Sequence, residues 1–278
     1  MKRHFVLLDI DHTLLSDRGE LLESNVRAVE AARRRGAIVV LATARSFVGA
    51  RPVHQALKLD TPVIASNGTI VYSAGGKVLK SEPIEAAKAR SIVELFLESD
   101  HHWAFRDLQA AYLHPEFVTD LPHMQDRSHY RPTPLHVLHE VLGDYSTLVS
   151  ASLFSNGHVL NDFYQTHDWH SLGLRSSFYP ANNFEPRQVM SVISLSASKG
   201  EAAKWLKGYL GLNGAPVVAF GDSADDVSMY ELGTGVAPAN ASPAALERAD
   251  WVAPHSDEGA VAAGIRRFLQ LEDVAVEG

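Results

Sequence analysis

Short apolar segments alternate with amphipathic segments near both ends of the chain, and this alternation constrains the fold most. Three segments have the composition of buried strands: residues 4–8 (HFVLL), 37–43 (AIVVLAT) and 216–220 (PVVAF). Two others, residues 24–36 and 198–211, have the pattern of helices. Strands that are apolar on both faces and alternate with helices are typical of a parallel sheet with helices on each side. The pattern predicts an α/β fold with a doubly wound parallel sheet, a Rossmann-like core.

The helix predicted at residues 24–36 carries a start signal and a stop signal. Serine is a preferred N-cap because its hydroxyl accepts a hydrogen bond from the first turn, and glycine is a common residue just after a helix ends. We therefore expect Ser24 to be the N-cap and Gly36 to end the helix.

The pattern changes near Ser81. Helix-like and strand-like segments then follow without a regular alternation to about Met190, after which the chain is apolar again at residues 192–195. We expect residues 1–81 and 190–278 to form the core, and residues 82–189 to form an inserted α+β cap domain.

The composition excludes several classes of protein. The chain has 278 residues, 46% of them hydrophobic, with a formal net charge of -8 and no cysteine. An acidic chain is a poor binder of phosphate backbones, and a chain without cysteine has no disulfide, thiolate metal site or cysteine nucleophile. The apolar stretch before Asp9 is too short for a signal peptide, and no later segment is long enough to cross a bilayer. We expect a cytoplasmic protein that binds neither nucleic acid nor a membrane, and the sequence says nothing about its oligomeric state.

Polar residues follow the predicted core strands at the points where these strands end. The residues come from distant parts of the sequence: Asp9, Asp11, Thr43, Lys199, Asp222, Asp225 and Asp226. The carboxyl ends of parallel strands lie along one edge of a sheet, where ligands bind, so we expect these side chains to converge.

The chemistry of this set indicates phosphoryl transfer. Carboxylates at this density need a hard cation, and oxygen ligands suit Mg²⁺. Lys199 would supply a positive charge for a phosphate oxygen, Thr43 a hydroxyl donor, and the backbone N–H groups after Asp9 further donors. A nucleophile, a metal, a lysine and such donors are the usual components of a phosphoryl-transfer site.

The order of these motifs resembles the haloacid dehalogenase superfamily of phosphatases, and most closely its Cof-like branch. The motifs are DxDxT at residues 9–13, a threonine at a strand end, a lysine, and GDxxxD at residues 221–226, with SNGTIVY at 66–72 as a further similar stretch. The similarity covers most of the core. The inserted segment has the position and approximate size of a type II (IIB-like) cap.

The resemblance implies a Mg²⁺-dependent phosphatase that hydrolyses small phosphate monoesters through an aspartyl-phosphate. Asp9 would be the nucleophile, and Asp11 would protonate the leaving group and then activate water. The Asp9 carboxylate, the Asp11 backbone carbonyl and Asp222 would bind the metal, and Asp226 would hold metal-bound waters.

The remaining assignments concern the phosphate and three departures from the family pattern. Thr43 and Lys199 would bind phosphate, and Asn67 would line the site entrance. Asp225 is a phosphate-binding candidate that stands where asparagine is usual, and a carboxylate cannot donate to phosphate. His12 stands after Asp11, where the family often has glycine, and we expect its side chain to point at solvent. Ala44 stands after Thr43, where glycine is also common, and we expect this change to affect only the local freedom of the backbone.

Two alternative functions remain open at this point. A sugar phosphomutase of the same superfamily would return the phosphoryl group to a sugar, and a phospho-receiver would be phosphorylated without turnover. The substrate could be a sugar phosphate, a nucleotide, pyridoxal phosphate or flavin mononucleotide. Ten of the 14 histidines lie between His101 and His170, and we interpret them as polar surface or substrate contacts, not as a metal site.

Overall fold

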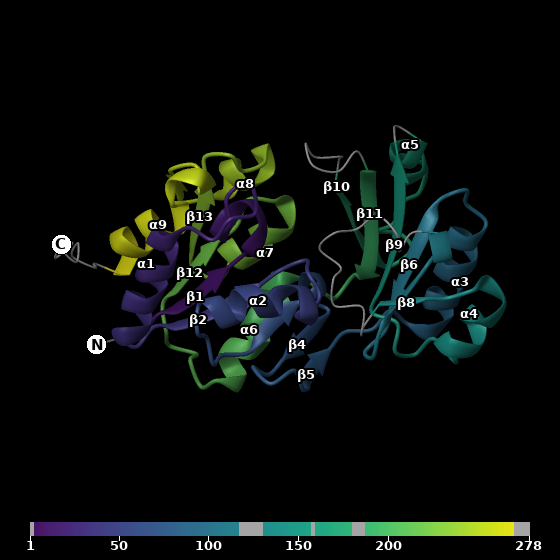
Figure 1. The fold of residues 1–278 in the computed structure, drawn as a ribbon, viewed down its shortest axis with the longest axis horizontal. Helices are drawn as coiled ribbons and strands as arrows, with labels where there is room; N and C mark the ends of the chain where they lie inside the picture. The colour runs from purple at the N-terminus through teal and green to yellow at the C-terminus, as the bar shows by residue number, and fades with distance from the viewer. Residues whose placement is uncertain (1–2, 117–129, 157–158, 180–186, 270–278) are drawn as a thin grey trace. The chain divides into compact units, whose positions relative to one another are not determined.

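The structure, a computed structural model, describes residues 3–116, 130–156, 159–179 and 187–269. The chain divides into two compact units (Figure 1). The first comprises Met1–Leu79 and Ser198–Gly278, and the second comprises Lys80–Ala197.

The first unit is built on an eight-stranded sheet with the strand order β14-β13-β12-β1-β2-β3-β4-β5. The strands are β1 (Phe5–Leu8), β2 (Ile38–Ala42), β3 (Val63–Ala65), β4 (Ile70–Tyr72), β5 (Val78–Ser81), β12 (Val217–Phe220), β13 (Thr234–Pro238) and β14 (Trp251–Ala253). Neighbouring strands from β14 to β3 are parallel, and β4 pairs with β3 antiparallel. This confirms the α/β class and the parallel core.

Helices cover both faces of this sheet. They are α1 (Glu23–Arg34), α2 (Phe47–Ala56), α6 (Lys199–Tyr209), α7 (Val227–Tyr230), α8 (Pro243–Arg248) and α9 (Ala260–Leu269). Val6 and Leu8 of β1 pack in one apolar cluster with α1, α2 and α9, whereas Phe5 and Leu7 pack in another with α6, α7 and α8. Because alternate residues of a strand point to opposite faces, a fully apolar β1 requires this double cover.

The start of α1 differs from the prediction. The helix begins at Glu23 with Leu22 as its N-cap, so the assignment of Ser24 was wrong, whereas Gly36 does follow the helix end in a left-handed conformation (φ +84). Tertiary hydrogen bonds hold this end instead. The side chain of Asn25 donates to the carbonyl of Leu14 at 2.9 Å and accepts from the N–H of Ala262 at 2.9 Å.

The second unit contains a six-stranded, mainly antiparallel sheet with the order β10-β11-β9-β6-β7-β8. The strands are β6 (His102–Arg106), β7 (Ala111–Leu113), β8 (Tyr130–Pro132), β9 (Ser150–Asn156), β10 (Leu174–Tyr179) and β11 (Arg187–Ser194), and the helices are α3 (Ala86–Leu97), α4 (Leu135–Leu142) and α5 (Val159–Thr166). Apolar residues of the helices pack against the sheet in a separate core. The unit is therefore α+β, with its own hydrophobic core.

The second boundary between the units lies later in the chain than the sequence suggested. Residues 190–197 were expected in the core, but β11 pairs with β9 and β10 along its length and Val192 is buried in the core of the second unit. The apolar run at 192–195 is that of a central strand in either sheet, so local composition does not reveal its partners.

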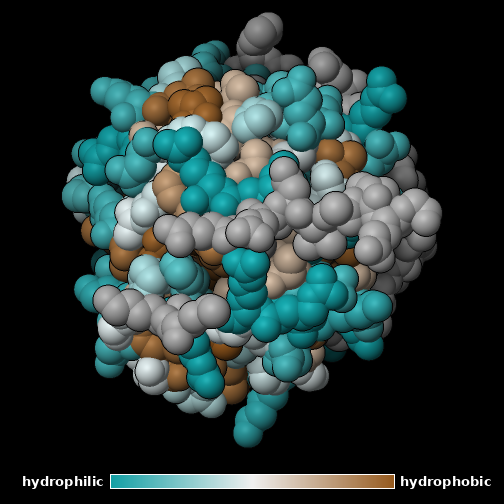
Figure 2. Space-filling view, turned by 90° about the vertical axis from the view of Figure 1, so that its left-hand side faces the viewer, coloured by the Kyte–Doolittle hydropathy of each residue, from teal (hydrophilic) through white to brown (hydrophobic). Residues whose placement is uncertain are grey.

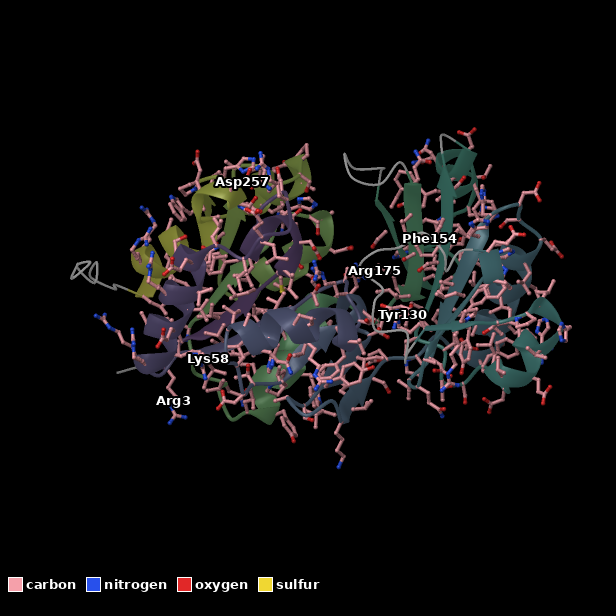
Figure 3. The ribbon with its side chains drawn as sticks, viewed as in Figure 1. Arg3, Lys58, Tyr130, Phe154, Arg175 and Asp257 are labelled. Carbon is pink, nitrogen blue, oxygen red and sulfur yellow. The ribbon has the colours of Figure 1, made fainter. Side chains whose placement is uncertain are left out.

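The sheet of the second unit has aromatic and cationic residues on the face away from α3 and α4. Tyr130 and Phe154, labelled in Figure 3, pack against Ala111 and Leu113. The guanidinium of Arg106 lies 5.8 Å from the centre of the Tyr130 ring, within cation–π distance.

The surface view in Figure 2 shows a mainly hydrophilic face on which hydrophobic residues form small separate groups. Among the described residues, no helix combines the length and the apolar character needed to cross a membrane.

Candidate active site

The central strand of the first unit delivers Asp9 to the edge of the sheet. The N–H of Asp9 donates to the carbonyl of Phe220 at 3.0 Å, which extends the pairing of β1 with β12 by one residue. The Asp9 side chain is buried. The chain then turns sharply: Asp11 has extended backbone angles, and His12 is left-handed with φ 53.

The neighbouring strand β12 delivers the second acidic segment. Oδ2 of Asp226 accepts hydrogen bonds from the N–H groups of Asp222 (3.1 Å) and Ser223 (2.9 Å) and from the Ser223 hydroxyl (2.8 Å). Gly221 makes this possible, because a Cβ atom there would lie 2.2 Å from the Cβ of Asp226. Asp226 therefore organises the loop that carries Asp222.

Lys199 joins the two acidic segments. It is the first residue of α6, and its Nζ atom lies 2.6 Å from Oδ1 of Asp9 and 2.6 Å from Oδ1 of Asp226. Only 3% of the lysine is exposed. The ammonium group is therefore buried between two carboxylates, with which it forms charge-assisted hydrogen bonds.

The ends of β2 and β3 meet at the same edge. Thr43 follows β2 and is buried, and its carbonyl accepts from the N–H of Asn67 at 3.0 Å. The Asn67 amide donates to Oδ2 of Asp225 at 3.2 Å. Gly68 has φ +88, and a Cβ there would lie 2.1 Å from the carbonyl oxygen of Ser198. Glycine therefore allows the loop after β3 to pack directly against the start of α6.

Two contacts of this site were not anticipated from the sequence. The hydroxyl of Thr13 donates to Oδ1 of Asp222 at 3.0 Å, and Arg45 forms a two-point contact with the carboxylate of Asp11. Thr13 belongs to the DxDxT motif quoted above, and Arg45 lies two positions after Thr43. These positions are the only signal for the two contacts, because the partners are distant in sequence.

The acidic residues of this site carry more negative charge than the ammonium group of Lys199 can neutralise. Oxygen atoms of Asp9, Asp222 and Asp226 lie within 4.8 Å of one another. Burial, and then the charge of Asp226, raise the pKa of Asp222 to about 6. Burial also raises the pKa of Asp9, with Lys199 opposing this and Asp226 and Asp222 adding to it.

Lys199 keeps its proton in this setting. Burial alone would lower the pKa of the Lys199 ammonium group, but Asp226 and Asp9 outweigh burial and raise that pKa well above its ordinary value. One ammonium group among three close carboxylates, of which those of Asp9 and Asp226 are buried, leaves net negative charge. A hard divalent cation such as Mg²⁺ would compensate it through oxygen ligands, so the donor set fits this metal.

His12 lies beside the acidic site and is partnered. Its Nδ1 atom is 2.9 Å from Oδ1 of Asp17, and 41% of its side chain is exposed. Burial lowers the pKa of the His12 imidazole, but the hydrogen bond to Asp17 and the charge of Asp222 outweigh it and raise the pKa. The backbone carbonyl of His12 accepts from the side chain of Asn240 at 3.0 Å, which holds this turn.

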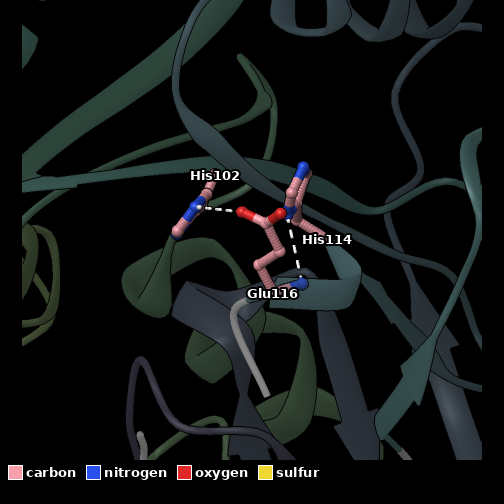
Figure 4. Close-up of side chains that lie close together, drawn as sticks. All are labelled: His102, His114 and Glu116. Atoms are coloured by element: carbon pink, nitrogen blue, oxygen red, sulfur yellow. Dashed lines mark hydrogen bonds and ion pairs between the residues drawn. The ribbon is translucent and has the colours of Figure 1, made fainter. Parts of the chain in front are cut away.

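A histidine cluster in the second unit does not have the geometry of a metal site. Ligand atoms of His102, His114 and Glu116 lie within 4.8 Å of one another (Figure 4). However, the two imidazole rings stack with an angle of 18° between their planes, and Nδ1 of His114 accepts from the N–H of Glu116 at 3.3 Å. Lone pairs in nearly parallel ring planes do not converge on one ion, so we interpret this cluster as polar surface.

Solved structures with the same fold include hydrolases of the haloacid dehalogenase superfamily. A haloacid dehalogenase-like hydrolase from B. subtilis superimposes with a TM-score of 0.75 at 25% identity, covering 96% of this chain and all of that one. A HAD subclass IIB sugar phosphatase, BT4131, superimposes with a TM-score of 0.78 at 19% identity, covering 96% of this chain and 100% of that one. At this identity the second likeness concerns the fold alone.

The chain belongs to the haloacid dehalogenase-like hydrolase family, whose model matches residues 6–265. Pyridoxal phosphate phosphatase YbhA of Escherichia coli (strain K12) is 32% identical to it over 266 residues, which is 91% of this chain and 93% of the relative. HMP-PP phosphatase of Serratia proteamaculans (strain 568) is 27% identical over 273 residues, 94% of each chain. The family and these relatives place the chain among the phosphatases of the superfamily.

Proposed function

We propose that this chain is a Mg²⁺-dependent phosphatase that hydrolyses small phosphate monoesters through an aspartyl-phosphate on Asp9. The single observation that supports this most is the buried ammonium group of Lys199, which lies between Asp9 and Asp226 and beside Asp222. Carboxylates this close together destabilise the folded protein, and groups of this kind are typical of catalytic sites.

In the first half of the reaction a carboxylate oxygen of Asp9 attacks phosphorus. A bond forms between that oxygen and phosphorus while the bond to the leaving oxygen breaks, and Asp11 transfers its proton to the leaving alkoxide. Lys199 holds Asp9 and stabilises a phosphate oxygen. The Thr43 hydroxyl accepts from the N–H of Arg45 at 3.1 Å, so its own proton is available to the phosphate.

In the second half water attacks the aspartyl-phosphate. Asp11 takes a proton from the water, the water oxygen bonds to phosphorus, and the bond between phosphorus and the Asp9 oxygen breaks. Inorganic phosphate leaves, and Asp11 is protonated again for the next cycle.

We assign the metal to Asp9, Asp222 and the backbone carbonyl of Asp11. When bound, Mg²⁺ would neutralise charge on the phosphate oxygens. Asp226, whose carboxylate already accepts from Lys199 and from the loop of Asp222, would hold metal-bound waters and keep Asp222 in place.

The substrate is proposed to be a small phosphorylated metabolite, and the relatives named above make pyridoxal phosphate the first compound to test. We propose that the second unit, as an inserted cap, sets which leaving groups the enzyme accepts.

The test is phosphate release from a panel containing pyridoxal phosphate, sugar phosphates, nucleotides and flavin mononucleotide, with Mg²⁺ and with EDTA. We expect Mg²⁺-dependent release from a few compounds and none in EDTA. Asp9→Asn should abolish release without changing the unfolding midpoint, while Asp60→Asn, at a side chain that is 87% exposed, should leave release unchanged. Release by Asp9→Asn, or release that EDTA does not reduce, would contradict the proposal.

A further inference from the structure

The side chain of Asp11 is held by a residue from a different strand end. Nε of Arg45 donates to Oδ2 of Asp11 at 2.9 Å, and an Nη2 hydrogen bond of 2.5 Å reaches Oδ1. This two-point contact fixes the plane of a carboxylate as well as its position. The two residues are 34 positions apart in sequence, so the orientation of Asp11 depends on the segment that follows β2.

Arg45 is itself held on three sides. Its N–H donates to the hydroxyl of Thr43 at 3.1 Å, and its carbonyl accepts from the N–H of Ser66 at 2.8 Å. A third hydrogen bond, 3.3 Å long, joins Nη1 to the carbonyl of Gly49 in α2. The backbone of Arg45 is therefore anchored at two points and its guanidinium group at a third, and only a third of its side chain is exposed.

The segment that carries Asp11 does not supply this orientation. Asp11 has extended angles (φ -74, ψ 138) and is followed by His12 at φ 53, so it lies on an irregular turn. Its carboxylate is nevertheless close enough for its charge to contribute to the raised pKa of Asp9. A group on such a turn needs an external partner if it is to stay in one position near the nucleophile.

We propose that Arg45 is a positioning residue, which fixes the carboxyl group of Asp11 for proton transfer to the leaving group and from water. The inference rests on the proposed function, because it assigns a purpose to the acid and base of that reaction. Proton transfer requires heavy atoms within hydrogen-bond distance, and small misplacements of a catalytic group reduce rates strongly. A protonated Asp11 keeps one of the two contacts through its carbonyl oxygen, which leaves its O–H for the leaving group.

The dependence of the rate on the leaving group tests this role. 4-Nitrophenolate leaves without needing a proton, whereas an alkoxide needs one. We therefore expect Arg45→Met to lower kcat/KM for butyl phosphate by about tenfold or more and kcat/KM for 4-nitrophenyl phosphate by less than about threefold. Arg45→Lys, which keeps a charged donor, should recover part of the loss on butyl phosphate.

Two controls separate positioning from other roles. Inhibition by inorganic phosphate should be the same in Arg45→Met and the wild type, because a positioning residue does not bind the phosphate. Arg27→Met removes an exposed arginine that pairs with Glu23 at 2.7 Å in α1, and it should change neither ester.

The outcomes distinguish the two proposals. If the wild type hydrolyses 4-nitrophenyl phosphate with Mg²⁺ but Arg45→Met loses the same factor on both esters, or loses nothing, the role of Arg45 is wrong while the proposed function remains. Weaker inhibition by inorganic phosphate would likewise overturn it and make Arg45 a phosphate ligand. If the wild type hydrolyses no ester, both proposals fail.

Discussion

The Nζ atom of Lys199 lies 2.6 Å from Oδ1 of Asp9, and both side chains are almost completely buried. In this position the lysine supports the nucleophile that we propose and at the same time binds Asp226. The pair therefore links the start of α6 to the ends of β1 and β12. Removing one partner of a buried ion pair leaves an uncompensated charge, so this contact is tested most directly through the lysine.

Lys199→Met should abolish phosphate release and destabilise the protein by about 3–5 kcal/mol, because Asp9 and Asp226 would remain buried without their cation. Phosphate release and urea unfolding measure the two effects. Lys204→Met is the matched control on the same helix. The Lys204 side chain is 68% exposed, and its Nζ atom makes a long, exposed ion pair of 3.9 Å with Oε1 of Glu201. A stable and active Lys199→Met variant would refute the assignment.

Activation by Mg²⁺ should depend on pH through Asp222, whose pKa in the metal-free protein is raised to about 6. A carboxyl group must be ionised to bind the metal, so the Mg²⁺ concentration for half-maximal activity should rise about tenfold for each pH unit below 6. The measurement is a Mg²⁺ titration of activity between pH 5 and pH 8. A constant half-maximal concentration across this range would contradict the role of Asp222.

The thermal stabilisation by Mg²⁺ should be larger at pH 7.5 than at pH 5. The pKa of Asp222 is higher in the folded protein than its ordinary value of 3.8, so its contribution to stability is present at low pH and is lost as the pH rises through about 6. Above that pH the bound metal compensates the charge of the ionised Asp222 and restores the lost stability. Differential scanning calorimetry with Mg²⁺ and with EDTA gives both shifts, and equal shifts at the two pH values would show that Asp222 is not involved.

Gly68→Ala should destabilise the protein by more than Gly36→Ala and should lower activity. Both glycines are left-handed, with φ +88 and +84, so each substitution carries a backbone cost of about 1–2 kcal/mol. Only at Gly68 would the new Cβ meet another atom, the Ser198 carbonyl oxygen at 2.1 Å, whereas nothing lies within 4 Å at Gly36. Chemical denaturation compares the two variants, and equal losses would show that the close packing of this loop on α6 is unimportant.

Asp225→Asn should strengthen phosphate binding. The substitution removes a negative charge from the proposed phosphate site and adds an amide donor, while its carbonyl oxygen can still accept from Asn67 as Asp225 does at 3.2 Å. We expect the inhibition constant of inorganic phosphate to fall by about three- to tenfold, which corresponds to one additional hydrogen bond of about 1 kcal/mol. Weaker or unchanged inhibition would mean that Asp225 does not face the phosphate.

The core of the fold was predictable because its signal is local. β1 and β12 are apolar at every position, and a strand buried on both faces has to be apolar throughout, so the composition of residues 5–8 and 217–220 specifies both strands and their covered environment. The convergence of Asp9 and Asp222 at one edge also follows, because parallel strands present their carboxyl ends together.

The membership of β11 was not predictable in the same way. Residues 192–195 are apolar enough for either sheet, and strand pairing depends on partners in β9 and β10 that the local sequence does not identify. The start of α1 failed for a related reason, because the hydrogen bonds of Asn25 to Leu14 and Ala262 hold that end where a side-chain cap was expected.

The sequence by itself determined the chemical inventory of this protein: carboxylates at two strand ends, a lysine at the start of a helix, a hydroxyl between them, and the family to which they belong. The tertiary structure decided how these groups are paired. The contact of Arg45 with Asp11 spans 34 residues and that of Thr13 with Asp222 spans 209. Such pairings depend on side-chain directions that only the packed sheet and its loops establish, which is why composition and spacing do not reveal them.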